Sequence, residues 1–200
     1  AWLFEHNVTV PCCHVPSGLL PATKLKGMWN KISLTPYGKK VIEALQIIEP
    51  KVEALSFIPT DTSTEEVPFI NIGQDQPVSL KRHGEGMFRI LQLVLSMINA
   101  KGGLLLIDEF ENGLHYSIQP RVWQLLMELA TKLDVQVFAT THNWDCVKSF
   151  QQASEEVSEL EIFLFRLGRS MRKRDKGLVI ASEYNKDELR TVTQAESEVR

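Results

Sequence analysis

Hydrophobic and polar residues in the first part of the chain follow two different periods. Segments 23–32 and 36–48 carry apolar residues at helical spacing, and Pro50 ends the second segment. We therefore predict two short amphipathic helices. Three short runs follow, KVEALSFIP, VPFINIG and PVSLKR, and the polar stretch DTSTEE divides the first two. Runs of this length and composition predict strands, which we expect to form an antiparallel sheet.

From residue 83 onward, longer apolar helices alternate with short apolar strands. The pattern predicts a helix over 83–103 with glycines at both ends, a buried strand GLLLID, a helix over about 117–133 and a strand VQVFATTH. A strand, a helix and a strand in this order imply a parallel pair with a right-handed crossover. A helix near 144–153, the strand ELEIFLFRL, a basic turn, the strand LVIASEY and a helix from Lys186 complete the chain. The predicted class is α/β, mainly a parallel sheet flanked by helices, with an antiparallel portion.

Composition is typical of an ordinary globular domain. Hydrophobic residues make up 44% of the 200 positions and charged residues 24%, which is enough for one core. The formal net charge of −3 gives no overall signature for nucleic acid, so any DNA contact has to be local. Three cysteines without metal-ligand spacing favour a reducing compartment, and neither a signal peptide nor a membrane-spanning run is evident. We expect a cytoplasmic protein without membrane contact, and we interpret the chain as a fragment because Ala1 begins within a strand-like stretch.

Two adjacent carboxylates follow the apolar strand in GLLLIDEFENGLH, residues 103–115. Ligands of parallel α/β sheets bind at the carboxyl edge, to which this strand delivers them. Asp108 is predicted to hold Mg²⁺, directly or through water, and Glu109, pointing the other way on an extended backbone, to polarise an attacking water. Four apolar residues followed by Asp-Glu form a Walker B motif. The alternative is that the strand simply ends here and its polar residues enter solvent.

A second polar group follows the next strand of the predicted sheet. Thr140, Thr141 and His142 end the run VQVFATTH, one crossover after the carboxylates. A histidine at such a place donates a hydrogen bond to a γ-phosphate oxygen. A lone histidine at a strand end is more often structural, but its pairing with Asp108 and Glu109 on the neighbouring strand favours the catalytic interpretation.

Two glycine-containing turns flank these strands. Asn112 and Gly113 lie in a tight polar turn directly after the carboxylates, and Gly84, Glu85 and Gly86 precede an apolar helix. Backbone amides at a helix N-terminus bind phosphate, so the second turn is predicted to contact nucleotide. The alternatives are an ordinary loop and a helix start with glycines in its turn.

The order of these motifs resembles the signature, Walker B, D-loop and H-loop of ABC-type ATPases, in particular the OLD-like branch of AAA-annotated proteins. The likeness is close from Leu80 to about Asp145, and the stretches GMWNKISLTP and VIEALQIIEPKVEAL extend it over most of the chain. It implies the C-terminal part of an ABC-type P-loop NTPase head. Residues 1–76 then form the segment between the two halves, with helices and short strands, and residues 77–200 the C-terminal lobe.

The same resemblance implies the ligands and the assembly. ATP and Mg²⁺ are the expected cofactors, and the expected partner is a second copy bound head to tail. The signature loop of one protomer then contacts the nucleotide of the other. The D-loop, which contains Asn112 and Gly113, crosses the interface and helps to bind the nucleotide in the opposite site. The signature serine falls at Arg82, so either Arg82 takes over the charge contact, or Ser79 or backbone amides supply it.

A Walker A loop, Gly-x-x-x-x-Gly-Lys-Ser/Thr, does not occur in the sequence. The only Gly-Lys pair, Gly38-Lys39, is followed by Lys40 and has Ser33 where the first glycine belongs. The resemblance implies that the loop lies on an upstream part or on another polypeptide. We therefore expect these residues alone to bind ATP weakly and to hydrolyse little.

The leading hypothesis is an ATP-hydrolysing head that couples turnover to action on DNA or on an effector protein, as the resemblance implies. A non-hydrolysing regulatory or scaffold subunit is the alternative from another class, which the missing Walker A loop favours. An OLD-type nuclease needs a carboxylate-rich TOPRIM domain, which these residues do not contain. The basic turn over 166–176 carries six positive charges against Asp175, and a solvated hairpin tip is favoured there over a DNA contact.

Overall fold

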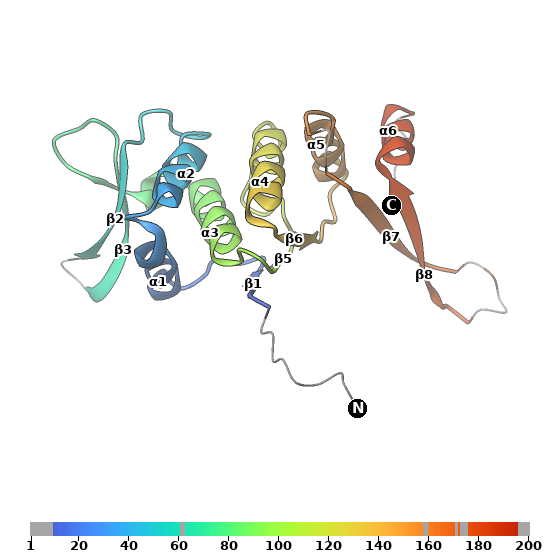
Figure 1. Cartoon of the computed structure of the whole chain (residues 1–200), viewed down its shortest axis with the longest axis horizontal. Coiled ribbons are helices and arrows are strands. Elements are labelled where there is room, and N and C mark those ends of the chain that lie inside the picture. The colour runs from blue at the N-terminus through green and yellow to red at the C-terminus, as the bar shows by residue number, and fades with distance from the viewer. Residues whose placement is uncertain (1–9, 61–62, 158–159, 171, 173–175, 196–200) are drawn as a thin grey trace.

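The computed structural model describes residues 10–60, 63–157, 160–170, 172 and 176–195 (Figure 1). Its helices stand in a row along one side of the molecule in Figure 1, and the strands of a central parallel sheet lie beneath them. An antiparallel sheet stands at one end of the row and an antiparallel hairpin at the other. The predicted α/β class, with a parallel sheet flanked by helices and an antiparallel portion, is confirmed.

Two helices open the described chain after its first strand. They are α1 (Ala22–Ile32) and α2 (Pro36–Leu45), as the helical spacing predicted. Thr35 caps α2, because its side-chain oxygen accepts a hydrogen bond from the Tyr37 N–H and Pro36 occupies the first helical turn. The second helix therefore starts where predicted, although it ends three positions before residue 48.

The predicted antiparallel sheet is present and has the order β2-β3-β4. Its strands are β2 (Ala54–Thr60), β3 (Ser63–Asn71) and β4 (Val78–Ser79). The run PVSLKR is a strand over only two residues, and a 3₁₀ helix, η1 (Leu80–His83), replaces the rest. The side chain of Leu80 is fully buried, so hydrophobic burial accompanies the turn of the chain toward the core at this position.

The parallel sheet has the order β1-β5-β6, from β1 (Cys12–Val15), β5 (Leu104–Ile107) and β6 (Gln136–Ala139). The predicted β-α-β unit is confirmed, since α4 (Gln119–Leu133) connects two parallel neighbours. Leu105 and Ile107 are buried on the side of the sheet that faces the helices. The side chains of the other face are more open. In register across it lie His14, which is exposed, Leu106, 37% exposed, and Phe138, 53% exposed.

The helix α3 (Glu85–Asn99) occupies the centre of the molecule. It packs against α1, α2, α4 and β1 (Figure 1), and its residues from Met87 to Ile98 are buried except for Phe88, which is partly buried. Such a helix is apolar on nearly all sides because it has little contact with water. Arg89, Gln92 and Ser96 are its buried polar residues. The Arg89 guanidinium and the Gln92 side-chain oxygen have hydrogen-bond partners, whereas Gln92 Nε2 and Ser96 Oγ have none among the described residues.

A smaller unit ends the described chain. It consists of α5 (Trp144–Glu155), the hairpin of β7 (Phe163–Arg169) and β8 (Val179–Asn185), and α6 (Lys186–Gln194). Val147, Ile162 and Leu189 form its core. A capping box starts α6, where the Asn185 side chain accepts from the Glu188 N–H and the Glu188 side chain accepts in return. No helix among the described residues is both long and apolar enough to cross a membrane.

Two helical glycines offer a matched test of packing. A Cβ atom on Gly38 in α2 would lie 2.6 Å from the backbone oxygen of Ser33, whereas a Cβ on Gly27 in α1 would meet nothing within 4 Å. We expect Gly27→Ala to raise the free energy of unfolding by about 0.5–1 kcal/mol, because alanine favours the helix. Gly38→Ala is expected to lower it by about 1–3 kcal/mol through overpacking. Urea unfolding of both variants measures the difference, and equal shifts would contradict the close approach of α2 to Ser33.

Candidate functional site

The three parallel strands end at the same level. Val15 pairs with Ile107, and Ile107 pairs with Ala139. The polar residues that follow each strand therefore meet at one carboxyl edge of the sheet: Pro16 and Ser17 after β1, Asp108 and Glu109 after β5, and Thr140, Thr141 and His142 after β6. The structure thus brings the carboxylates to the same edge as the residues after β6.

Thr140 joins the two neighbouring strand ends. Its hydroxyl donates a hydrogen bond to Asp108 Oδ1 over 2.8 Å and accepts one from the Glu109 N–H over 2.9 Å. Its backbone oxygen accepts from the Phe110 N–H over 3.0 Å. Because the Thr140 hydroxyl acts as both donor and acceptor, this one side chain links the orientation of the Asp108 carboxylate to the backbone at Glu109.

The backbone at Glu109 differs from the prediction. We expected an extended conformation, but φ is 47°, which lies in the left-handed region that residues with a Cβ avoid. The cost of such a conformation is about 1–3 kcal/mol, and it persists only where the surroundings enforce it. The hydrogen bond from Glu109 N–H to Thr140 is one such restraint. Glu109 itself is partly exposed and Asp108 is exposed, so both carboxylates are accessible.

Phe110 anchors the turn that carries the carboxylates. Its side chain is fully buried and its ring stacks on Trp123 of α4, with centroids 3.6 Å apart and planes 10° apart. Trp123 in turn meets the edge of Phe150 on α5. Burial of a phenylalanine contributes several kcal/mol. The residue after the carboxylates therefore holds the turn against the helix layer.

Glu111 connects the turn after β5 to the residues after β6. Its Oε1 accepts a hydrogen bond from the backbone N–H of His142 over 3.1 Å. His142 is exposed at the sheet edge.

Cys146 is buried near Glu111, and only 1% of the residue is exposed. Burial raises the pKa of its thiol to about 12, and the nearby Glu111 carboxylate adds to the rise. The thiol is consequently neutral and sits behind the edge as a packing group.

The predicted phosphate-binding turn lies against the turn after β5. A Cβ on Gly86 would come within 2.9 Å of the Gly113 backbone oxygen, and a Cβ on Gly113 would lie 3.4 Å from the Glu85 Cβ. Gly84 precedes the helix with φ 82° and ψ 176°, a conformation that is essentially restricted to glycine. No side chain caps α3 at Gly84, so its first amides are available to an anion. Arg82 lies one turn earlier, on η1, and is exposed.

Sequence reasoning missed Arg89. The residue is 2% exposed, and its guanidinium donates to the backbone oxygens of Pro16 over 2.5 Å, Asp108 over 2.7 Å and Glu109 over 2.7 Å. An arginine within an otherwise apolar helix was the available signal, since a buried charge requires partners. The pattern alone does not say which backbone groups those partners are.

The loop after β1 was also missed. Ser17 O accepts a hydrogen bond from Asn112 Nδ2 over 2.7 Å, and the Leu20 N–H donates to the buried side-chain oxygen of Gln92 on α3. Asn112, predicted as a nucleotide-contacting residue, therefore also fixes a neighbouring loop. This loop lies far from the other motifs in sequence, and only the parallel pairing of β1 with β5 places it at the same edge.

The chemistry of Asp108 fits a magnesium ligand. Mg²⁺ in phosphate-transfer sites takes one or two carboxylates, and water and phosphate oxygens complete its shell. Asp108 is exposed and one of its oxygens is fixed by Thr140. No cluster of three or more His, Cys, Asp or Glu ligands occurs among the described residues. A magnesium ion bound by Asp108 would take most of its ligands from water and phosphate oxygens.

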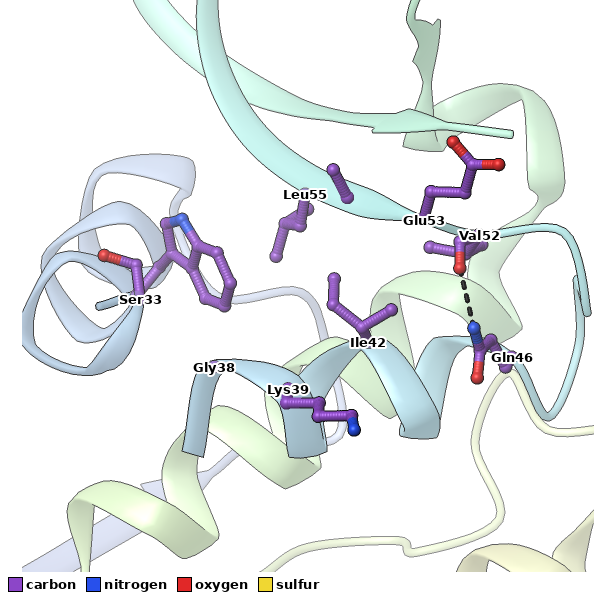
Figure 2. Close-up of a pocket in the computed structure, with 10 residues that line it drawn as sticks. Ser33, Gly38, Lys39, Ile42, Gln46, Val52, Glu53 and Leu55 are labelled. Atoms are coloured by element: carbon purple, nitrogen blue, oxygen red, sulfur yellow. Dashed lines mark hydrogen bonds between the residues drawn. The ribbon is translucent and has the colours of Figure 1, made fainter. Parts of the chain in front are cut away.

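The Gly38-Lys39 pair does not form a phosphate-binding loop. Both residues lie within the first turns of α2, which follows another helix rather than a strand. Figure 2 shows them beside an open cavity of about 560 Å³ that is lined mainly by α1, α2 and the start of β2. Gln46 Nε2 donates to the Val52 backbone oxygen at its far end. This cavity shares no residue with the sheet edge, and we assign it no role in the site.

The basic turn lies only partly within the described residues. Arg166 and Arg169 are exposed on β7, and Arg172 and Lys176 are exposed in the turn. Residues 173–175 lie outside the described part. A DNA contact at this turn stays a prediction.

Comparisons with known proteins identify related sequences and folds. Residues 33–145, more than half of the chain, match the family described as "AAA domain, putative AbiEii toxin, Type IV TA system". No curated protein matches the sequence. The matched range includes Asp108, Glu109 and His142. The narrower OLD-like resemblance stays a prediction.

Solved structures resemble the chain at low sequence identity. One comes from work titled "Structural biochemistry of ATP-driven dimerization and DNA stimulated activation of SMC ATPases", with a TM-score of 0.52, 12% identity and coverage of 86% of this chain and 96% of that chain. An SMC head bound to the C-winged helix domain of ScpA has a TM-score of 0.48 and 14% identity, with coverage of 74% of this chain and 42% of that chain. The SMC head of Pyrococcus furiosus bound to the C-terminal domain of ScpA has a TM-score of 0.47 and 12% identity, with coverage of 80% of this chain and 37% of that chain. The first likeness shows that the fold is that of an SMC-type ATPase head.

Thiol labelling tests the packing behind the sheet edge. Cys146 is buried with a raised pKa, whereas Cys12 is exposed. At neutral pH we expect a maleimide to label Cys146 at least about 100-fold more slowly than Cys12, because reaction requires both a thiolate and local opening. Mass spectrometry of the folded protein measures both rates, and labelling in urea provides the control in which the difference disappears. Equal rates in the folded protein would show that this thiol of α5 is not buried against the rest of the protein.

Proposed function

The chain belongs to the AAA domain family described as "putative AbiEii toxin, Type IV TA system", and from this membership we propose that it is the catalytic, C-terminal half of an ABC-type ATPase head that hydrolyses ATP. The observation that carries the proposal is the Thr140 bridge between Asp108 and Glu109. It places two accessible carboxylates at the carboxyl edge where α/β proteins bind ligands. His142 follows β6, the strand that Thr140 also follows.

Each residue at the edge has a separate role in the proposal. Glu109 orients and polarises the water that attacks the γ-phosphate. Asp108 holds Mg²⁺, which bridges phosphate oxygens and neutralises their charge. His142 donates a hydrogen bond to a γ-phosphate oxygen. Support comes from geometry: Glu111 fixes the backbone of His142 and Thr140 fixes that of Glu109, so the groups keep a set spacing when substrate arrives.

We place the missing phosphate-binding loop on polypeptide outside these residues. The sequence contains no Walker A motif, and the parallel sheet keeps one comparatively open face with Leu106 and Phe138 on it. Parallel sheets are normally covered on both faces. A second half that carries the loop and packs on this face supplies both features. In this arrangement residues 77–200 act as the C-terminal lobe, and residues 1–76 connect it to the other half.

The proposed ATPase works as a homodimer bound head to tail. The uncapped N-terminus of α3 at Gly84, with Glu85 and Gly86, contacts the nucleotide of the other protomer. Arg82, exposed one turn before, replaces the signature serine as a charged contact. Asn112 and Gly113 lie at the interface. The structural relative with a TM-score of 0.52 is described as dimerising under ATP and as activated by DNA, which agrees with a cycle that acts on DNA or on an effector protein.

A scaffold role is the second candidate. The observation that favours it is the absence of a Walker A motif from the sequence. In that case the nucleotide fold assembles partners and does not hydrolyse ATP. Discovery of Gly-x-x-x-x-Gly-Lys-Ser/Thr elsewhere in the intact protein would support hydrolysis, and its absence would support the scaffold.

The first test replaces the proposed general base. In the intact protein, Glu109→Gln is expected to lower the ATP turnover rate about 100-fold or more, because an amide does not accept the proton of the attacking water. ATP binding is retained, so the protein accumulates as an ATP-bound dimer that size-exclusion chromatography detects. Glu128→Gln, an exposed carboxylate on α4, is the control and keeps the parent rate. Unchanged hydrolysis in Glu109→Gln would rule out the assignment.

The second test concerns the proposed γ-phosphate contact. His142→Ala is expected to reduce kcat about 10- to 1000-fold, as is typical when one donor to developing charge is removed. The effect on unfolding is small, since the side chain is exposed and the Glu111 contact uses the backbone N–H. Steady-state kinetics and thermal unfolding separate the two quantities. A parent-like kcat would return His142 to a structural role.

A further inference from the structure

Arg89 is the most deeply buried charge in the described structure that lies beside the candidate site. Only 2% of the residue is exposed, and α3 around it is apolar from Met87 to Ile98 apart from Gln92 and Ser96. A guanidinium has five N–H donors and no acceptor. Burying it costs several kcal/mol unless the donors find partners. Its partners therefore reveal what the charge does.

The partners are backbone oxygens at the ends of two parallel strands. Nη2 donates to Asp108 O and Glu109 O over 2.7 Å each, and Nη1 donates to Pro16 O over 2.5 Å. A longer contact of 3.5 Å joins Nε to Phe110 O. The guanidinium thus spans the backbone of both carboxylate residues and of the loop after β1. A planar fork suits several acceptors in fixed directions, which a point charge does not.

The hydrogen bonds restrain the one residue at the edge with an unfavourable backbone. Glu109 has φ 47°. Arg89 holds its carbonyl oxygen, and Thr140 holds its N–H. The peptide groups on both sides of the Glu109 Cα are therefore fixed from different parts of the chain, α3 and the residue after β6. With both fixed, the direction in which the Glu109 side chain leaves the backbone, its Cα–Cβ bond, is determined.

The same helix carries the phosphate-binding turn. Gly84 is the N-cap of α3, and Arg89 lies in the second helical turn. A displacement of the helix start is transmitted along a rigid helix to the guanidinium. The contact of Gly86 with Gly113 provides a second connection between the helix start and the turn after β5.

We infer that Arg89 is a positioning residue that couples the N-terminus of α3 to the aim of Glu109. The inference rests on the proposed function, in which the helix start contacts nucleotide on the other protomer. Nucleotide at Gly84–Gly86 then stabilises the arrangement in which Arg89 holds the backbone of residues 108–110. Hydrolysis in one site thereby depends on closure of the dimer.

The test compares two substitutions in the intact protein. Arg89→Lys keeps the charge but loses the fork, and Arg89→Gln removes the charge and retains one pair of N–H donors. Both are expected to lower kcat roughly 10- to 100-fold, as is typical when a reacting group is displaced by about 1 Å. KM for ATP stays within about threefold, because neither change touches the nucleotide. Arg121→Lys, on the exposed surface of α4, is the matched control and keeps the parent kinetics.

The Arg89→Gln variant keeps the test valid if Arg89→Lys fails to fold. A neutral amide is less costly to bury than an ammonium without sufficient partners, so Arg89→Gln is expected to remain folded where Arg89→Lys does not. Circular dichroism and thermal unfolding establish the temperature at which rates are compared. Parent-like kcat in either folded variant would overturn the inference, as would a rise in KM that accounts for the whole loss.

A double-mutant cycle separates positioning from general stability. If Arg89 acts through Glu109, adding Arg89→Lys or Arg89→Gln to Glu109→Gln lowers the single-turnover hydrolysis rate by less than about twofold further. Additive losses would overturn the coupling. The cycle also distinguishes the two proposals: if Glu109→Gln leaves hydrolysis unchanged, the proposed function fails. If only the Arg89 variants behave like the parent, the ATPase assignment stands and the positioning role does not.

Discussion

The unshifted parallel pairing of β5 with β6 is the constraint on which the candidate site depends. Ile107 lies opposite Ala139, so Asp108 and Thr140 leave the sheet side by side. A slip by one residue would turn Thr140 to the opposite side of the sheet and would break its hydrogen bonds to Asp108 and Glu109. The register that alternates buried and exposed positions along β5 therefore determines the geometry of the candidate site as well as the core.

Buried polar side chains of α3 make hydrogen bonds that hold the chain at the carboxyl edge of the parallel sheet. Gln92 and Arg89, one turn apart on α3, hold the loop after β1, and Arg89 also holds the end of β5. Hydrogen bonds to a charged group contribute about 1.5–3 kcal/mol each, which offsets much of the cost of burying the guanidinium. Burial lowers the pKa of Arg89, while the neighbouring carboxylates of Glu111, Asp108 and Glu109 oppose that change. These acidic residues are thus part of the electrostatic environment that keeps the guanidinium charged.

The sequence was sufficient for the order of elements from residue 83 onward, because the change between helical spacing and short apolar runs is distinct there. It also located the carboxylates and His142 at strand ends, where the structure places them. It did not indicate that β1 is the neighbour of β5, since strand order depends on contacts between distant residues. The extended backbone predicted at Glu109 was wrong for a similar reason. Its φ of 47° is enforced by Thr140 and Arg89, and no local pattern records either contact.

Close packing of two glycines has a consequence for the proposed dimer. Gly86 approaches the Gly113 backbone so closely that a Cβ would lie 2.9 Å from its oxygen, so the start of α3 and the turn after β5 cannot move toward each other. Interiors packed at this density transmit displacement instead of absorbing it. If nucleotide bound by the partner protomer pushes Gly84 and Gly86 toward this turn, Asn112 and Gly113 are displaced with them. The loop after β1 follows, because Asn112 holds Ser17. A displacement at the trans contact therefore reaches the chain after β5 and also the loop after β1, which carries no carboxylate.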